Sequence, residues 1–486
     1  MEIKSITVLG AGTTGLTTAL ILKKKLPELD VVVIGSSQIG IIGVGEGSTE
    51  HLNKFRELLG ISRWDMVRDT GGSLKYGIYF DGWQGEETHY IHSLSDLVLA
   101  NDDQYEYMMG GILIDNDNSD ATVDPHLIEN IVQENSPPNQ FHFNTFKLND
   151  FLVKQCELNK IKIIDDKIIS VNKDDKQNII SLNAEKTIYK ADFYIDCSGF
   201  RRELVGKYED VQFISKSDQL LLNHAIAFPT DELPDYPALT LSKAMKAGWM
   251  WRIPVYGRTG NGYVFSDKHI SVDEAKKEVE DLLGHPIEIA RDVKFEPGYL
   301  NKFWKNNVCA VGISGSFFEP IEATAIGTGL QQAFLLADLL PAYRKNEEYQ
   351  AKRFNDVMQY FMNNLFEFVR LHYLNCREDT PFWKDVSNLS LPEDFKQKIN
   401  SWKTRLPRKW EFEYRPHVLF QQNNFIQLLN AIKWFDKSAI KKEMELKGYY
   451  DRYKIEQAEK IKQRKEDTKA VKMKHRDFIY KLHEEE

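Results

Sequence analysis

Three glycines in the spacing Gly10-x-Gly12-x-x-Gly15 could bring the backbone close to a pyrophosphate. They lie between a predicted strand, 3–9, and a predicted helix that begins near Thr14. Glycine has no Cβ, so the pyrophosphate can approach the first helical turn, where backbone N–H groups attract anions. In a strand–turn–helix setting this spacing predicts a dinucleotide site rather than a tight turn without a ligand.

The second predicted strand, 31–35, departs from the usual dinucleotide pattern. An Asp or Glu normally ends this strand and binds the ribose hydroxyls. Here the strand ends at Gly35 and Ser36. We therefore expect Ser36 or backbone groups to hold the adenosine half of the cofactor.

The stretch "GWMWRIP", 248–254, contains two indoles that could form a rigid wall. In an extended segment, residues two apart point to the same face, so Trp249 and Trp251 should lie side by side. Pro254 fixes its own φ and favours an extended conformation at Ile253. The alternative interpretation is a well-packed core strand.

Two further segments resemble ligand-binding turns. "GVGEGSTEHL", 43–52, is a glycine-rich turn before a helix start near Ser48 or Thr49, although a capped helix would look the same. "DCSGFRR", 196–202, ends a strand and turns sharply at Gly199. Together with the first glycine turn, these segments resemble the flavoprotein monooxygenase class, in which they wrap FAD.

A closer resemblance is to the flavin-dependent halogenases, of which the tryptophan halogenases are best known. "GWMWRIP" fits their GWxWxIP signature. "LKYGIYFDGW", 74–83, "GISGSFFEPIEATAIG", 312–327, and "FVRLHYLNCREDTPFW", 368–383, are similar to three other segments of that family. The matches run from about residue 3 to residue 383, which is most of the chain.

The resemblance implies a role for each matching position. Lys75 and Glu322 stand where the family has its catalytic residues, although either alone would pass for a surface lysine or a loop acid. Thr324 and Ala325 stand at the halide position, where Ala325 replaces a glycine and its easy access to positive φ. The resemblance also implies a tunnel wall of Trp249, Trp251 and Pro254 and a substrate contact at His92, for which a core or surface histidine is the alternative interpretation. Trp402 is a further candidate substrate contact from its aromatic type alone, with packing as the alternative. FAD contacts are expected at Gly10, Gly12, Thr13, Thr14, Gly15, Ser36, Gly45, Glu46, Gly47, Ile168, Gly199, Ile313 and Ile326.

The resemblance also implies a reaction. FADH2 from a separate flavin reductase, O2 and a halide ion would give hypohalous acid, which passes to Lys75 and halogenates an electron-rich aromatic of the indole or phenol type. Lys75 would act either as a neutral amine that forms a haloamine or as a charged hydrogen-bond donor. Glu322 would stabilise the cationic ring and assist its loss of a proton. Two alternatives stay open: a flavin monooxygenase that hydroxylates an aromatic, and a flavin-binding protein without catalysis.

Composition sets the wider expectations for the 486 residues. The patterns predict an α/β fold, with a Rossmann-like FAD-binding core over 1–343, a loop-rich insertion at about 84–145 and β-sheet insertions on the substrate side, followed by a mainly helical module over 344–486. The net charge of −9 argues against nucleic acid as a partner. The four cysteines lack CxxC spacing, which argues against zinc and disulfides.

The two ends of the sequence carry further expectations. "MEIKSITVLGAG" enters a strand at once, so we expect no signal peptide, no membrane segment and a cytoplasmic location. The charged stretch 454–486 predicts a mostly solvated helix, which leaves contact with a second copy of the chain open.

Overall fold

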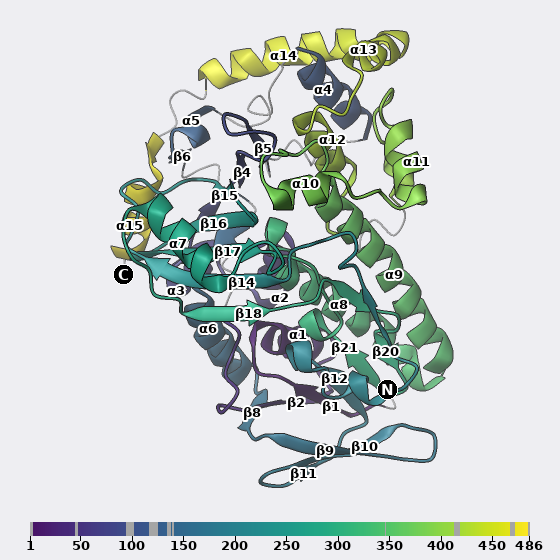
Figure 1. Cartoon of the computed structure of the whole chain (residues 1–486). Coiled ribbons are helices and arrows are strands. Elements are labelled where there is room, and N and C mark those ends of the chain that lie inside the picture. Colours follow the sequence, from purple (N-terminus) through teal and green to yellow (C-terminus); the bar gives the residue numbers. More distant parts are fainter. Residues whose placement is uncertain are drawn as a thin grey trace.

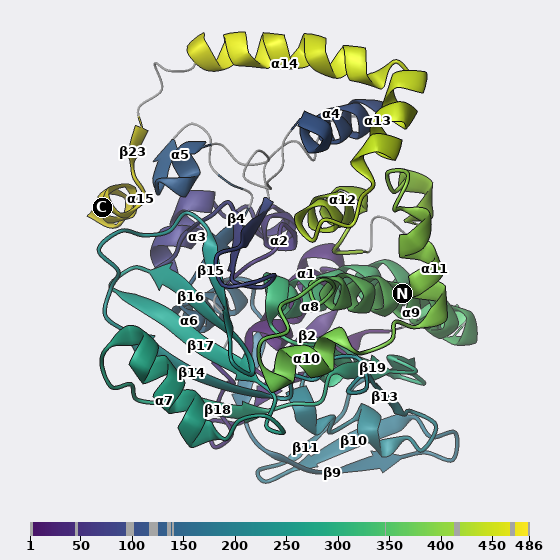
Figure 2. The ribbon, with the colours of Figure 1, turned by 45° about the horizontal axis from the view of Figure 1, so that its top comes forward.

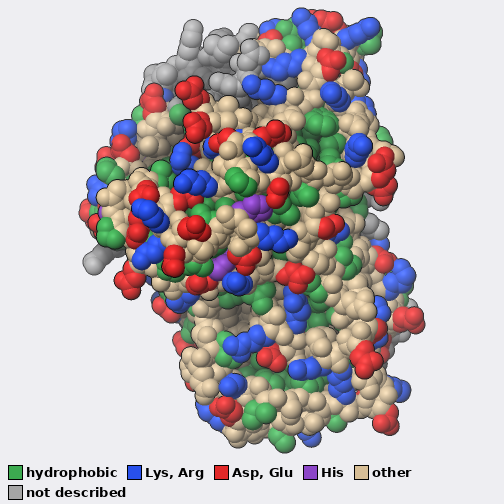
Figure 3. All heavy atoms as spheres, in the orientation of Figure 1, with side chains coloured by type: hydrophobic (Ala, Val, Ile, Leu, Met, Phe, Trp, Pro, Cys, Tyr) green, Lys and Arg blue, Asp and Glu red, His purple; other side chains and the backbone are tan. Residues whose placement is uncertain are grey.

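A computed structural model describes residues 3–43, 47–93, 102–115, 125–133, 138, 140–345, 347–412, 418–466 and 472–484. Within these ranges no helix combines the length and the apolar character that a membrane crossing needs. Figure 3 shows acidic and basic side chains interspersed over one face of the molecule, in keeping with the modest net charge of −9.

The predicted strand–helix–strand unit is present. β1 (Ser5–Leu9), α1 (Thr13–Lys25) and β2 (Asp30–Gly35) follow one another, and β1 pairs in parallel with β2. β1 and β2 belong to a six-stranded sheet in the order β20-β21-β12-β1-β2-β8. Its strands are parallel except for β20. The other members of this sheet are β8 (Lys162–Asp165), β12 (Phe193–Asp196), β20 (Trp304–Lys305) and β21 (Val308–Ala310). α1 packs against α6 (Thr145–Leu158) and α8 (Thr324–Leu339).

A second, mainly antiparallel sheet (Figure 1) includes the strand that contains the two tryptophans. Its strand order is β18-β14-β17-β16-β15-β4-β5, and only β4 and β15 run in parallel. The tryptophans lie on β16 (Gly248–Val255), which pairs with β15 and β17 and confirms the expected extended segment. The other strands are β4 (Gly77–Asp81), β5 (His89–Ser93), β14 (His224–Thr230), β15 (Thr240–Met245), β17 (Arg258–Phe265) and β18 (Arg291–Lys294).

The remaining strands form small sheets of two or three strands. The antiparallel pattern expected between 161 and 196 is found in a three-stranded sheet at the base of Figure 1, whereas the first and last strands of that stretch join the parallel sheet. The small-sheet strands are β3 (Ser73–Lys75), β6 (Ile131–Gln133), β7 (Gln140–His142), β9 (Ile168–Lys173), β10 (Ile179–Ala184), β11 (Ile188–Tyr189), β13 (Phe213–Ser215), β19 (Gly298–Leu300), β22 (Ser316–Phe317) and β23 (Lys472–Lys474). The α/β fold class is confirmed.

The chain after residue 344 is mainly helical, as predicted. The remaining helices are α2 (His51–Leu59), α3 (Arg63–Asp69), α4 (Asp102–Asp115), α5 (Pro125–Ile128), α7 (Val272–Leu283), α9 (Glu347–Leu371), α10 (Pro381–Ser387), α11 (Glu393–Ser401), α12 (Gln422–Ala431), α13 (Lys437–Leu446), α14 (Tyr449–Glu466) and α15 (His475–Glu484). The largest hydrophobic cluster contains side chains from both sides of residue 343, for example Val311 and Phe361. The domain boundary at 343/344 therefore stays a prediction.

The expectation of one solvated C-terminal helix is wrong from residue 472 onward. α14 lies across the top of Figure 2, but the chain then returns as β23, which pairs with β6, and as α15, which packs against α3. His475, Phe478 and Ile479 are buried. Phe478 and Ile479 follow His475 by three and four residues, so the three side chains lie on one buried face of the helix. The many charged residues of this segment hide that pattern in the sequence.

Candidate active site

A long pocket lies beside the glycine turn, at the carboxyl end of the parallel sheet. Its volume is about 460 Å³. Ten of the expected cofactor residues line it: Gly10, Gly12, Thr13, Thr14, Gly15, Ser36, Ile168, Gly199, Ile313 and Ile326. Gly47 instead lines a second cavity, and Gly45 and Glu46 lie outside the described residues.

The N-terminus of α1 suits an anionic group such as a pyrophosphate. Its N-cap is Gly12, with no side-chain cap hydrogen bond and no acidic residue in the first turn. A Cβ on Gly12 would meet no protein atom closer than 3.9 Å, so this glycine leaves open space above the helix end. The unshared N–H groups and the positive end of the helix dipole therefore face an open cradle.

The missing acid at the end of β2 has a steric cause. A Cβ on Gly35 would lie 2.4 Å from the Cβ of Ala11, so the close approach of the glycine turn excludes a side chain there. An acid is instead found on the neighbouring strand, where Asp165 pairs with Gly35 in register. Its carboxylate accepts hydrogen bonds from the N–H and the hydroxyl of Ser37, each at 2.8 Å.

The resemblance implies that FAD binds in the long pocket, and Gly35→Asp is expected to weaken this binding by about tenfold or more instead of supplying the ribose ligand. The reason is that the new side chain displaces Ala11 and the glycine turn. Titration of the protein with FAD, followed by flavin fluorescence, measures the change. Circular dichroism verifies that the variant is folded, and tighter binding would contradict the steric argument.

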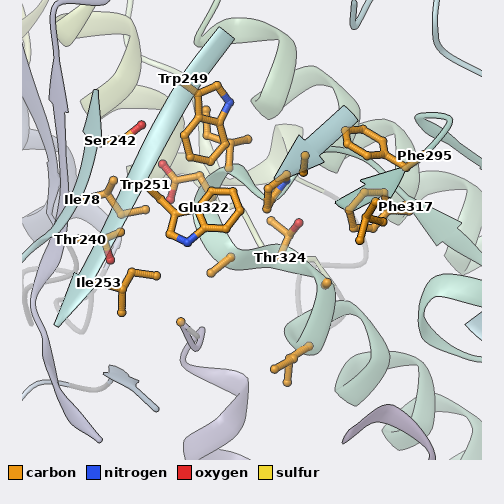
Figure 4. Close-up of a pocket in the computed structure, with 18 of the residues that line it drawn as sticks. Ile78, Thr240, Ser242, Trp249, Trp251, Ile253, Phe295, Phe317, Glu322 and Thr324 are labelled. Carbon is orange, nitrogen blue, oxygen red and sulfur yellow. The ribbon is translucent and has the colours of Figure 1, made fainter. Parts of the chain in front are cut away.

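The second cavity, which we call the lysine cavity, has a volume of about 120 Å³ and brings together the expected catalytic and halide residues and the two indoles (Figure 4). Its lining includes Lys75, Trp249, Trp251, Glu322, Thr324 and Ala325. Five residues line both this cavity and the long pocket: Ile42, Phe200, Ile313, Ala325 and Ile326. The two spaces therefore meet at the start of α8.

The two indoles project from the same face of β16. Their ring centroids are 6.0 Å apart, and in Figure 4 they extend between Thr240 on one side and Phe317 on the other. Pro254 continues the strand opposite Thr259 and is absent from the lining of both described pockets.

A buried glutamate that sequence analysis missed fixes the first indole. Trp249 Nε1–H donates to Glu319 Oε1 at 2.9 Å, and the hydroxyl of Tyr373 donates to the same oxygen at 2.6 Å. Burial raises the pKa of Glu319 to about 7, although both hydrogen bonds oppose this shift. The wall is therefore held by a specific hydrogen bond as well as by packing.

Lys75 ends β3 and is only 1% exposed. Its ammonium donates to the carbonyl of Ser48 at 3.0 Å. Burial lowers the pKa of Lys75 to about 8, and the nearby Glu322 carboxylate opposes this shift. The side chain is thus close to its titration point near neutral pH.

Glu322 lies in an unusual backbone turn before α8. Glu322 and Ala323 both have left-handed conformations, with φ of 64° and 54°, which cost about 1–2 kcal/mol each for non-glycine residues. Ala325, where we expected the loss of a glycine to matter, lies in the first turn of α8 and needs no positive φ. The strain in this loop is therefore at Glu322 and Ala323 rather than at Ala325.

One histidine is hydrogen-bonded to the Glu322 carboxylate and a second lies beside it. His92 Nδ1 is 2.8 Å from both carboxylate oxygens, and His372 Nε2 is 3.3 Å from Oε1. Burial alone would raise the pKa of Glu322, but the two histidines hold it well below its usual range. Asn424 Nδ2 can only donate to His92 Nε2, at 3.0 Å, so the His92 proton is on Nδ1 and points to Glu322. The carboxylate is therefore ionised and fixed.

Two expected substrate residues are found elsewhere. His92 supports Glu322 from behind and is absent from the described pocket linings. Trp402 is fully buried, stacks on Phe412 and donates its indole N–H to Glu411 at 2.9 Å. His372, which sequence analysis did not single out, lies within the quoted segment 368–383.

Several known proteins that are similar to this chain are halogenases. Residues 5–444 match the family model described as tryptophan halogenase. The chain is 29% identical over 443 residues to the tryptophan 6-halogenase SttH of Streptomyces toxytricini, which covers 83% of this chain and 84% of that protein. It is also 29% identical over 440 residues to the tryptophan 7-halogenase RebH of Lentzea aerocolonigenes, covering 83% and 82% of the two chains.

Solved structures show the same fold. A tryptophan halogenase from Shewanella frigidimarina has a TM-score of 0.86 at 22% identity, covering 99% of this chain and 98% of that chain. A flavin-dependent halogenase from Xanthomonas campestris has a TM-score of 0.81 at 24% identity, with the same coverage of 99% and 98%. From the family match over most of its length, this chain belongs to the tryptophan halogenase family of flavin-dependent halogenases.

Proposed function

We propose that this enzyme uses FAD, O2 and a halide ion to make hypohalous acid, and that Lys75 directs the acid to an electron-rich aromatic substrate of the indole or phenol type. The observation that carries the proposal is the lysine cavity, where Lys75 and Glu322 face the same space, which joins the long pocket. Chloride, bromide and iodide are all candidate halides.

The glycine turn and the N-terminus of α1 would hold the cofactor's pyrophosphate, and Ile313 and Ile326 would contact its ring at the junction of the two pockets. When bound and reduced, FAD supplies with O2 the two-electron oxidation that converts a halide to hypohalous acid. We further propose that a separate flavin reductase in the cytoplasm supplies the reduced cofactor.

Halide binding is assigned to the start of α8. Thr324 is the first residue of this helix and Ala325 the second, and both line the lysine cavity. The helix has no side-chain cap and no acidic residue in its first turn, so its backbone N–H groups and dipole are available to an anion. The halide would then lie where the two pockets meet.

The indoles keep the oxidant and the organic substrate apart. Trp249 and Trp251 line the lysine cavity, and the hydrogen bond that the Trp249 indole donates to Glu319 fixes the first ring. This arrangement supports a confined route for a small oxidant and excludes a larger aromatic from the flavin side.

At Lys75 the ammonium would donate a hydrogen bond to the oxygen of hypohalous acid and weaken its oxygen–halogen bond. The aromatic ring forms a bond to the halogen, the oxygen–halogen bond breaks, and the leaving oxygen takes the ring proton to become water. Glu322 stabilises the cationic ring between these events. Because its pKa is held well below the usual range, its charge serves this role better than its basicity.

The pH dependence tests which form of Lys75 acts. With a pKa of about 8, the ammonium form prevails at pH 7 and is lost as the pH rises through 8. We therefore expect the aromatic product formed per hypohalous acid to fall above pH 8. A rise over the same range would instead favour a neutral amine and a haloamine.

The function itself is tested by mass spectrometry of products from indoles and phenols. The protein is supplied with FAD, a flavin reductase, NADH, air, bromide and catalase, beside a reaction without enzyme. A bromine isotope doublet supports the proposal. A product heavier by one oxygen and indifferent to bromide would indicate a hydroxylase, and no product from any compound would favour a flavin-binding protein without catalysis.

A further inference from the structure

The strand that carries Lys75 is held at its open edge by the C-terminal segment. In the described part of the chain, β3 pairs with one strand, β7. On its other edge, the backbone N–H of Leu74 donates to Nε2 of His475 at 3.0 Å. The N–H of Tyr76 donates to the carbonyl of Ala238 at 2.9 Å. The two backbone donors that flank Lys75 on this edge are therefore both satisfied.

The His475 imidazole is suited to this contact. Its Nδ1 lies 3.1 Å from the carbonyl of Pro237, which can only accept, so Nδ1 carries the proton and Nε2 is a bare acceptor. The ring is completely buried, which lowers its pKa to about 4 and keeps it neutral. His475 thus connects the loop at 237–238 to β3, as a neighbouring strand would.

Several independent contacts bring this histidine to β3. β23 pairs with β6 directly before it, and Phe478 and Ile479 are buried directly after it. Arg476 and the hydroxyl of Tyr480 each approach Glu232 Oε2 at 2.7 Å. The family match ends at residue 444, so this segment lies beyond it. Figure 2 shows β23 and α15 together at the side of the molecule, away from α14.

We propose that His475 is a positioning residue for Lys75, and that the segment 472–484 acts on the active site by fixing the edge of β3. This inference rests on the proposed role of Lys75. Without the imidazole, the Leu74 N–H has no acceptor at this edge and β3 can move away from 237–238. The Lys75 ammonium then leaves the carbonyl of Ser48, and water reaches it.

His475→Phe retains a ring of similar size and removes both polar contacts. We expect it to lower the aromatic product formed per hypohalous acid by about tenfold, because the reacting amine is displaced. FAD binding and hypohalous acid production, trapped with a thiol probe, should match the wild type. An activity-independent readout is the pH dependence of Lys75 labelling by acetic anhydride, measured by mass spectrometry of its peptide. Hydration of Lys75 should raise its pKa above about 8.

Two further variants separate positioning from general stability. His475→Gln can place an amide oxygen near the Leu74 N–H and should recover most of the product yield. Ile479→Ala removes buried surface from the same segment but leaves the hydrogen bond, so it should lower the melting temperature and keep wild-type labelling of Lys75.

The outcomes are distinguishable. The positioning role is overturned if acetic anhydride labels Lys75 in the His475→Phe variant with the wild-type pH dependence. It is also overturned if Ile479→Ala has the same effect on Lys75 labelling as His475→Phe. If the wild type makes no hypohalous acid, the proposed function fails, and the labelling of Lys75 still decides whether His475 positions it.

Discussion

Lys75→Met is expected to reduce aromatic halogenation by about a hundredfold or more, because it removes the only ammonium among the described residues that line the lysine cavity. Methionine is similar in length and tolerates burial, so the cavity should retain its shape. FAD binding and hypohalous acid production should continue, since Lys75 is absent from the lining of the long pocket. Product mass spectrometry and a thiol trap for hypohalous acid, applied to the same reaction, measure both quantities.

The control for this variant is Lys384→Met, which removes an exposed lysine on α10 and should leave both quantities unchanged. Halogenation at the wild-type rate in Lys75→Met would contradict the mechanism. A parallel loss of hypohalous acid would instead place the lysine in the oxidation of the halide.

Glu322→Gln should lower product formation by about a hundredfold, because it removes from a buried site the negative charge to which we assign stabilisation of the cationic ring. The amide can also turn an N–H toward His92, whose Nδ1 already carries a proton, so the strained turn loses a favourable contact. The yield of product per hypohalous acid should fall while FAD affinity stays constant. Steady-state product analysis and a flavin titration measure these two values.

Glu319→Gln is the matched comparison for this glutamate. It changes a buried glutamate three residues away that binds Trp249 and Tyr373, and its raised pKa of about 7 means that much of it is already uncharged. We expect its effect to be about tenfold smaller than that of Glu322→Gln. Equal losses in the two variants would argue against a specific electrostatic role for Glu322.

Local patterns predicted the parts of the fold that depend on neighbouring residues. The glycine turn, β1, α1 and β2 follow from a strand period, a turn and a helical period within 35 residues. The extended indole strand follows from the same kind of argument. The resemblance added the pairing of Lys75 with Glu322, which no local pattern contains because β3 and α8 lie far apart in the sequence.

The missed residues are the ones whose roles depend on tertiary contacts. His372 looks like any residue of a buried helix end, and only the fold brings it to Glu322. Glu319 stands beside the motif residues, yet its hydrogen bond to Trp249 joins the loop after β22 to β16, which lies far away in the sequence. His475 lies in a segment so rich in charge that its apolar stripe is hard to detect, and its contact with Leu74 joins the two ends of the chain. Periodicity carries no information about such partners.

The composition of the lysine cavity bears on how long each enzyme molecule survives its own chemistry. Hypohalous acid attacks sulfur fastest and electron-rich rings next, and the described lining of this cavity contains two indoles but neither cysteine nor methionine. The lysine cavity therefore lacks the side chains that react fastest, but hypohalous acid inside it still contacts Trp249 and Trp251. Attack on these two rings by the hypohalous acid that the enzyme makes, more than unfolding, should set the number of turnovers before inactivation.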